Sequence, residues 1–116
     1  MPDARRLLHT LERYFRGERV DFGGVELAFD DQTPFQRALA DALRAVRWGE
    51  IVSYRELARA AGAPNAQRAA GTFCAQNRFP LLVPCHRVVG GSGIGGYGSL
   101  GVAYKRRLLE LEGVTL

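Results

Sequence analysis

Hydrophobic residues recur at helical spacing along the chain and predict several amphipathic helices. The first is expected over residues 5–15; it ends near Gly17 and needs a partner surface for its apolar face. That face comprises Leu7, Leu8, Leu11, Tyr14 and Phe15. Residues 25–29 alternate between apolar and polar side chains, which is typical of a short strand, but the flanking glycines and aspartates fit an ordered loop almost as well.

A second helix opens with a capping box, in which Thr33 is the cap, Pro34 occupies the first turn and Gln36 lies three residues after the cap. We expect this helix to end at Gly49. Its apolar stripe is predicted to be core rather than a binding face, and comprises Phe35, Ala38, Leu39, Ala42, Leu43 and Val46.

Two shorter helices follow in a helix-turn-helix pattern. The first begins with the capping box of Ser53 and Glu56 and ends at Gly62, and the second runs from about Asn65 to Cys74. Some helix pairs of this kind bind DNA, whereas most are simply packed against each other.

The second helix of the pair carries one projecting side chain, Arg68, among small residues. A helix that reads the major groove normally offers several polar side chains to the base edges, whereas a smooth helix suits minor-groove binding with one inserted side chain. The small residues are Ala66, Ala69, Ala70 and Gly71. The alternative is a helix that is rich in alanine for tight core packing.

A C-terminal helix is expected over residues 102–111, with Glu112 at its end and Gly113 as its stop. The helix dipole opposes a carboxylate at this position. Glu112 is therefore either a routine solvent-facing charge, which the position alone favours, or a group kept there for a purpose.

The composition fits one domain, because 116 residues with 47% hydrophobic content can build a core without disulfide bonds or structural metal ions. No apolar leader or membrane-length run is present, so we expect an intracellular protein with free thiols at Cys74 and Cys85. Basic residues outnumber acidic ones by 16 to 12, and all but one are arginine, which suits phosphate contacts but is weak evidence for nucleic-acid binding. His9, His86 and the two cysteines lack the spacing of a metal site.

The strongest chemical signal is Cys85, which lies between Pro84 and His86, after an apolar run and before a glycine-rich loop at 90–96. A reactive cysteine needs a neighbour that lowers its pKa or takes its proton, and a backbone that presents it to a ligand. Adjacent side chains usually diverge, however. Spacing alone therefore leaves a buried structural cysteine beside a surface imidazole equally open.

The chain resembles the O6-alkylguanine-DNA alkyltransferase family, the methylated-DNA-protein-cysteine methyltransferases, from about Thr33 to Gly113. The resemblance is carried by Pro84-Cys85-His86-Arg87-Val88, Ser53-Tyr54, Arg68, Asn77 and residues 108–113. It implies a mainly α, winged-helix-like helix-turn-helix domain over residues 33–116, with a small β element beside Cys85. Residues 1–32 are then an N-terminal helix and connecting segment, the remnant of a larger N-terminal domain.

By this resemblance the protein repairs DNA through direct, single-turnover transfer of an alkyl group from O6-alkylguanine to Cys85, without a cofactor. The cysteine proton passes through a water to His86 and on to Glu112. Tyr54 donates a proton or a hydrogen bond to the departing guanine, and Asn77 holds the turn before the cysteine.

The target base must leave the duplex to reach the thiol, and Arg68 is expected to fill the gap from the minor groove. Further DNA contacts are expected from Tyr54, Arg55, Ala66, Ala69, Gly71 and Arg87. The extruded base is expected to meet Cys85, Val88, Tyr97 and Ser99. We expect a cytoplasmic monomer that associates with the nucleoid when it acts on DNA.

Two other functions stay open. A non-enzymatic alkyltransferase-like protein would recognise alkylated DNA and recruit other repair proteins, but such relatives replace the cysteine that this chain retains. A thiol hydrolase or redox protein would use Cys85 and His86, but it needs an oriented third group and an oxyanion hole or a resolving thiol, and the sequence shows none of these clearly.

Overall fold

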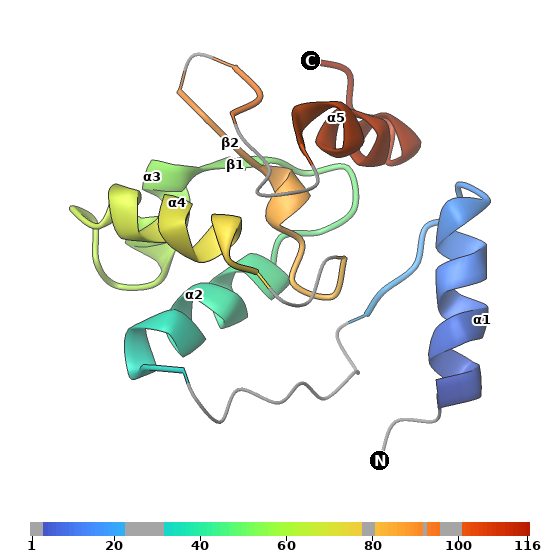
Figure 1. The fold of residues 1–116 in the computed structure, drawn as a ribbon, viewed down its shortest axis with the longest axis horizontal. Coiled ribbons are helices and arrows are strands. Elements are labelled where there is room, and N and C mark those ends of the chain that lie inside the picture. Colours follow the sequence, from blue (N-terminus) through green and yellow to red (C-terminus); the bar gives the residue numbers. More distant parts are fainter. Residues whose placement is uncertain (1–3, 23–31, 78–80, 92, 96–100) are drawn as a thin grey trace.

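The computed structural model describes residues 4–22, 32–77, 81–91, 93–95 and 101–116 (Figure 1). The helices are α1 (Ala4–Phe15), α2 (Pro34–Arg44), α3 (Tyr54–Ala60), α4 (Gln67–Ala75) and α5 (Gly101–Leu111), and a short 3-10 helix, η1, spans Cys85–Arg87. The described strands are β1 (Val52–Ser53) and β2 (Val88–Val89). The strand or loop predicted over residues 25–29 lies outside the described residues.

Both predicted capping boxes are present. The Thr33 side chain accepts from the Gln36 N–H at the start of α2, and the Ser53 side chain accepts from the Glu56 N–H at the start of α3. In return, the backbone N–H of each cap donates to the side chain of its partner. Because Ser53 both ends β1 and caps α3, Tyr54 is held at the first position of that helix.

The predicted end of α2 at Gly49 is wrong. The helix ends at Arg44, and the chain then passes through turns and bends before β1. The ladder of helical bonds breaks here, because the Val46 N–H donates over 3.0 Å to the Leu43 carbonyl three residues back and the next bond, from Glu50 to Arg47, closes a separate turn. Val46 is nevertheless buried, as its place in the apolar stripe predicts.

The predicted helix-turn-helix is formed by α3 and α4, which pack against each other and against α2. In Figure 1 the pair lies at one end of the fold, with α2 along its lower side. The main core that these helices enclose comprises Leu39, Ala40, Leu43, Val46, Leu57, Ala58, Ala70, Phe73, Val83, Cys85 and Val88. Cys85 is therefore part of the core that supports the helix-turn-helix.

The two strands anchor the segment that carries Cys85. β1 pairs with β2 in parallel, with Val52 opposite Val88 and Ser53 opposite Val89. Because β2 begins directly after η1, this pairing fixes η1 beside the start of α3. The mainly α fold, with a helix-turn-helix and a small β element beside Cys85, is confirmed.

Part of the predicted apolar face of α1 has a partner surface, whereas Leu8 and Phe15 of that face are exposed. Tyr14 is fully buried and forms a second cluster with Phe22 and with Leu108 of α5. In Figure 1, α1 lies on the same side of the fold as α5. None of the described helices combines the length and the apolar character needed to cross a membrane.

Candidate active site

Cys85 occupies the first position of η1 and is 2% exposed. Its backbone N–H donates to the Val83 carbonyl over 2.8 Å, and Asn77 Nδ2 donates to the same carbonyl, also over 2.8 Å. Asn77 thus ties the chain just after α4 to the residues before the cysteine, where the resemblance predicts it. The backbone of the cysteine is fixed, but its sulfur is closed to solvent.

The thiol of Cys85 lies beside a second thiol, that of Cys74 on α4. A hydrogen bond with Cys74 and burial raise the pKa of Cys85, while a hydrogen bond with Asn77 and the charge of Lys105 act in the opposite direction. Both cysteines are free thiols. Because thiolate is the reactive form, a thiol in these surroundings needs a base to take its proton.

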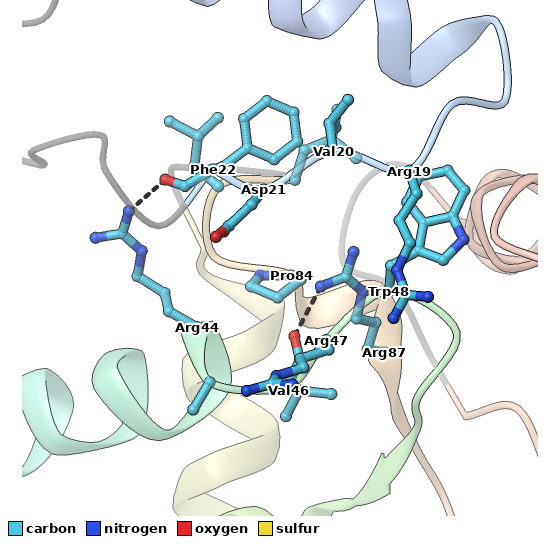
Figure 2. A pocket seen from close by; sticks show the side chains of 13 residues that line it. Arg19, Val20, Asp21, Phe22, Arg44, Val46, Arg47, Trp48, Pro84 and Arg87 are labelled. Atoms are coloured by element: carbon cyan, nitrogen blue, oxygen red, sulfur yellow. Dashed lines mark hydrogen bonds between the residues drawn. The ribbon is translucent and has the colours of Figure 1, made fainter.

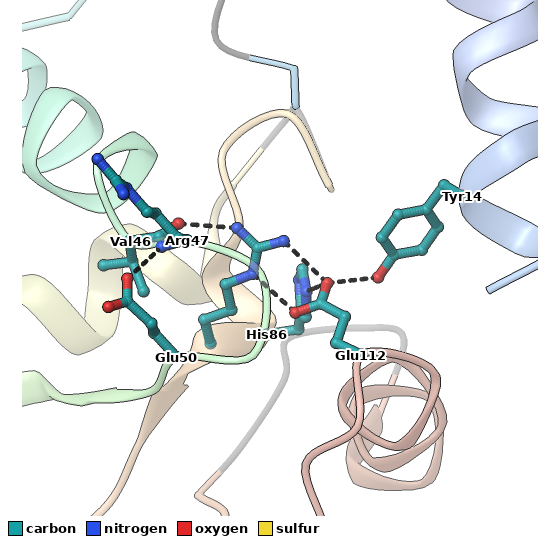
Figure 3. Close-up of polar contacts among 7 residues, drawn as sticks. Tyr14, Val46, Arg47, Glu50, His86 and Glu112 are labelled. Carbon is teal, nitrogen blue, oxygen red and sulfur yellow. Dashed lines mark hydrogen bonds and ion pairs between the residues drawn. The ribbon is translucent and has the colours of Figure 1, made fainter. Parts of the chain in front are cut away.

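His86 and Glu112 form a buried pair next to this cysteine (Figure 3). His86 Nε2 lies 2.6 Å from Glu112 Oε2. Arg87 donates to both carboxylate oxygens, from Nε to Oε1 over 2.8 Å and from Nη2 to Oε2 over 3.0 Å. The Tyr14 hydroxyl also donates to Oε2, over 2.6 Å. The carboxylate is thus held by donors from two separate parts of the chain.

These bonds set the protonation state of the pair. Burial on its own raises the pKa of Glu112, but the bonds from His86, Arg87 and Tyr14 outweigh it and lower that pKa to about 2. Burial lowers the pKa of His86, and its pairing with Glu112 opposes this. An ionised carboxylate only accepts, so Nε2 of a neutral His86 carries the hydrogen and Nδ1 keeps its lone pair.

The Nδ1 atom of His86 is the basic atom of the pair. It is buried and has no hydrogen-bond partner among the residues that the structure describes. The sequence alone also allowed His86 to be a surface imidazole. That alternative is wrong, since the whole His86 side chain is buried. A proton taken up at Nδ1 would be stabilised by the carboxylate at Nε2.

Glu112 and Arg87 are both more buried than the sequence predicts. Glu112 is 3% exposed, so the solvent-facing position that its place in the sequence favours is wrong. Arg87 is predicted to contact DNA, but it is 7% exposed and donates to Glu112 and to the Val46 carbonyl. The guanidinium is therefore engaged within the protein, because a buried carboxylate requires a charged partner there.

Tyr54 meets the glycine-rich loop at the start of α3. Burial raises the pKa of Tyr54, and the charges of Cys74 and Cys85 act in the same direction, so the phenol keeps its proton. A Cβ on Gly95 would lie 3.3 Å from the Tyr54 hydroxyl oxygen and 3.1 Å from the Gly90 nitrogen. Gly95 also has a φ of +75°, so glycine is required for the loop to approach Tyr54 this closely.

Lys105 of α5 lies at the site, although it is not among the site residues predicted from the sequence. It is fully buried; its Nζ donates to the Val88 carbonyl and lies 5.8 Å from the centre of the Tyr54 ring. Burial lowers the pKa of Lys105 to about 8, and the charges of Cys74 and Cys85 oppose the shift. A signal was available, since Lys105 is the single lysine among 16 basic residues.

The predicted DNA-binding face lies on α3 and α4. Arg55, Arg68 and Ala69 are exposed, whereas Ala66 and Gly71 are half-buried. Gln67, at the start of α4, is exposed as well, so Arg68 is not the one long side chain that this helix presents. The contacts of these residues with DNA stay predictions.

The predicted base pocket is described only in part. Tyr97 and Ser99 lie outside the described residues. Cys85 and Val88, the other two predicted members, both belong to the main core.

A cavity of about 570 Å³ opens between residues 19–22 and the turn after α2 (Figure 2). Within the described residues its lining includes Trp48, Pro84 and Arg87 but not Cys85. The cavity is therefore distinct from the pocket predicted for the base.

The family model for the 6-O-methylguanine DNA methyltransferase, DNA binding domain, matches residues 34–114. A methylated-DNA–protein-cysteine methyltransferase of Metallosphaera sedula is 43% identical over 107 residues, which cover 92% of this chain and 66% of that protein. The protein of the same name from Mycobacterium tuberculosis is 47% identical over 103 residues, which cover 88% of this chain and 61% of that protein. The chain thus spans less than two thirds of the length of these relatives.

Among solved structures, Mycobacterium tuberculosis OGT in complex with DNA has a TM-score of 0.81 at 40% identity, over 92% of this chain and 64% of that chain. S. pombe Atl1 in complex with damaged DNA containing O6-carboxymethylguanine has a TM-score of 0.59 at 26% identity, over 77% of this chain and 82% of that chain. The family match includes every site residue described above except Tyr14. The predicted resemblance is confirmed, and the chain belongs to the 6-O-methylguanine DNA methyltransferase family.

Proposed function

We propose that this chain repairs DNA by transferring the alkyl group of O6-alkylguanine in duplex DNA to Cys85, one group per protein molecule. A bond forms between Cys85 Sγ and the alkyl carbon, while the bond between that carbon and guanine O6 breaks. The electron pair of the broken bond stays on guanine O6, and the guanine takes up a proton and is restored as the normal base within the DNA strand. The observation that supports this most is the buried His86–Glu112 pair next to the cysteine.

The cysteine proton is proposed to pass through a water to His86 Nδ1. The ionised Glu112 then stabilises the imidazolium through Nε2, as the carboxylate of a catalytic triad does. The nearby ammonium of Lys105 favours the thiolate, which supports the same step. Tyr54, whose phenol keeps its proton, is proposed to donate to the departing guanine.

Duplex DNA is the proposed partner, bound through its minor groove by α3 and α4. Ala66, Ala69 and Gly71 let the backbone approach closely, and Arg68 fills the space left by the extruded base. Tyr54 and Arg55 add contacts from α3. Two structurally similar proteins, M. tuberculosis OGT and S. pombe Atl1, have been solved with DNA, which supports this proposal.

Base extrusion is part of the proposal, because a base stacked in a duplex cannot reach the sulfur of a residue that is 2% exposed. The base is proposed to meet Cys85, Val88, Tyr97 and Ser99. The Val88 carbonyl has a second lone pair besides the one used by Lys105, so it can accept from the guanine amine. Residues 33–116 are proposed to carry the DNA-binding face and the Cys85 site of a monomeric protein.

The test is to mix the protein with a duplex that contains O6-methylguanine and to weigh its peptides. The peptide with Cys85 should gain one methyl group. Cys85→Ala should transfer nothing yet still bind the duplex, whereas Cys74→Ala, which removes the neighbouring thiol, should still transfer. A folded wild-type protein whose Cys85 stays unmethylated would falsify the proposal.

A second candidate function is recognition of alkylated DNA without transfer of the alkyl group. One observation favours it, the similarity to Atl1. In that case the wild-type protein would bind the methylated duplex more tightly than an unmodified one and leave the methyl group on the DNA. The same experiment therefore separates the two functions.

A further inference from the structure

The carboxylate of Glu112 is completed by a residue from the other end of the chain. The Tyr14 hydroxyl donates to Glu112 Oε2 over 2.6 Å, across a separation of 98 residues. Tyr14 has no exposed surface. The same oxygen accepts from His86 and Arg87, so Tyr14 acts on the carboxylate atom that contacts His86, the proposed acceptor of the cysteine proton.

The position of Tyr14 is fixed independently of this hydrogen bond. Its ring makes edge contacts with Phe15 and Trp48, both with ring centres 5.3 Å apart, and a tilted contact with Phe22 at 6.0 Å. Because the ring is held by aromatic packing, the hydroxyl is directed at Glu112 before any substrate binds. Figure 3 shows Tyr14 reaching from α1 toward Glu112 and His86.

We propose that Tyr14 is a positioning residue for alkyl transfer, whose hydroxyl holds the Glu112 carboxylate and limits how strongly that carboxylate binds a protonated His86. This inference rests on the proposed function. The helix α1 lies outside the family match at residues 34–114. Through Tyr14 this helix nevertheless contributes a side chain to the site.

The physical reason is competition for one oxygen. Each hydrogen bond that Oε2 accepts withdraws charge from it and weakens its attraction for the imidazolium. Without the Tyr14 hydroxyl, Glu112 would hold the imidazolium more tightly, and the pKa of His86 would rise. His86 would then be protonated, and unable to accept the cysteine proton, over a wider range of acidic pH.

The other charged groups around the pair do not replace Tyr14. Burial lowers the pKa of His86 and Glu112 opposes this, whereas the charges of Arg87 from η1 and Lys105 from α5 lower it further. These two cations stay in place when the hydroxyl is removed. Arg87 keeps Glu112 ionised, so the change should be seen in His86.

The test uses Tyr14→Phe, which keeps the ring and removes only the oxygen. Two measurements follow the full chain: the single-turnover rate of methyl transfer from a duplex with O6-methylguanine against pH, and the nitrogen NMR titration of the imidazoles. The chain has two histidines, and the exposed His9 serves as an internal control. The His86 titration and the acid limb of the rate profile should both move to higher pH. A move of half a pH unit would slow transfer about threefold on the acid side.

Trp48→Phe is the matched control, because it disturbs the packing of the Tyr14 ring but keeps the hydroxyl. It should lower stability and leave the His86 titration unchanged. A 3-fluorotyrosine at position 14, whose hydroxyl is a stronger donor, should move the titration to lower pH and also serves if Tyr14→Phe folds poorly. Unchanged His86 titration in Tyr14→Phe, or an equal shift in Trp48→Phe, overturns the inference. A wild-type protein that transfers no methyl group overturns the proposed function instead.

Discussion

Arg87 and Glu112 form a two-point ion pair inside the protein, with guanidinium Nε on Oε1 and Nη2 on Oε2. The third contact of the guanidinium, from Nη1 to the Val46 carbonyl, reaches the turn after α2. One side chain, two residues after Cys85, thus joins η1, the end of α5 and that turn. The pair orients the carboxylate that contacts His86 and links this cluster to the turn after α2.

Glu112→Gln should lower the free energy of unfolding at pH 7 by roughly 3 kcal/mol, because it leaves the buried Arg87 cation without a charged partner. It should also slow methyl transfer, since the amide cannot stabilise a protonated His86 as the carboxylate does. Urea denaturation and single-turnover assays on the same preparation measure the two effects.

This loss of stability should depend on pH. The pKa of Glu112 in the fold is about 2, below the ordinary value of 4.5, so its contribution is present above pH 4.5 and is lost as the pH falls toward 2. The difference between the wild type and Glu112→Gln should therefore shrink below pH 4.5. Glu110→Gln, which removes an exposed carboxylate from α5, is the control. A difference that stays constant down to pH 3 would contradict the assignment.

Lys105→Met should slow the reaction of Cys85 with iodoacetamide at pH 7 by about tenfold, equivalent to ~1.4 kcal/mol, because the buried ammonium that favours the thiolate is gone. The effect should fade above pH 8, where Lys105 loses its proton, since its pKa is about 8. Arg107→Met removes an exposed cation from the same helix and should react like the wild type. Equal rates in both variants would remove Lys105 from the site.

Cys74→Ala should act in the opposite direction. The hydrogen bond with Cys74 is the largest of the causes that raise the pKa of Cys85, so its removal should lower that pKa and speed alkylation by iodoacetamide. The pH dependence of the rate, followed by the mass of the Cys85 peptide, reports the change. A slower reaction would mean that Cys74 supports the nucleophile rather than restraining it.

Gly95→Ala should slow methyl transfer by about tenfold or more, because the new methyl group would displace the loop from Tyr54 and would also sit at an unfavourable backbone angle. Gly91→Ala is the matched control in the same loop, since a Cβ there meets nothing within 4 Å. The measurement is the rate of methyl transfer from the same duplex to each of the two variants. Equal rates for the two variants would show that the loop does not need to lie against Tyr54.

The elements that the sequence predicts well are those whose signals are local. The capping boxes of Thr33 and Ser53 lie within four consecutive residues each, and both are present. The motif around Cys85, residues 84–88, is likewise continuous in the sequence. Such signals depend on neighbours along the chain, so no knowledge of the tertiary fold is needed to interpret them.

The contacts that the sequence does not reveal join distant residues. The Tyr14–Glu112 bond spans 98 residues, and no local pattern distinguishes this tyrosine from the rest of an apolar helix face. Lysine and arginine are usually exposed, so the burial of Lys105 and Arg87 runs against their ordinary preference. Only the packing of α5 against η1 shows that both cations turn inward.

Arg68→Ala tests the proposed role of α4. If the guanidinium fills the space left by an extruded base, its loss should slow transfer from a duplex lesion by about tenfold or more and leave the reaction with free O6-methylguanine unchanged, because only the duplex must be opened. Arg37→Ala, which removes an exposed arginine from α2, should slow neither reaction. Equal slowing of both substrates by Arg68→Ala would place Arg68 in the chemistry or the fold and remove it from base extrusion.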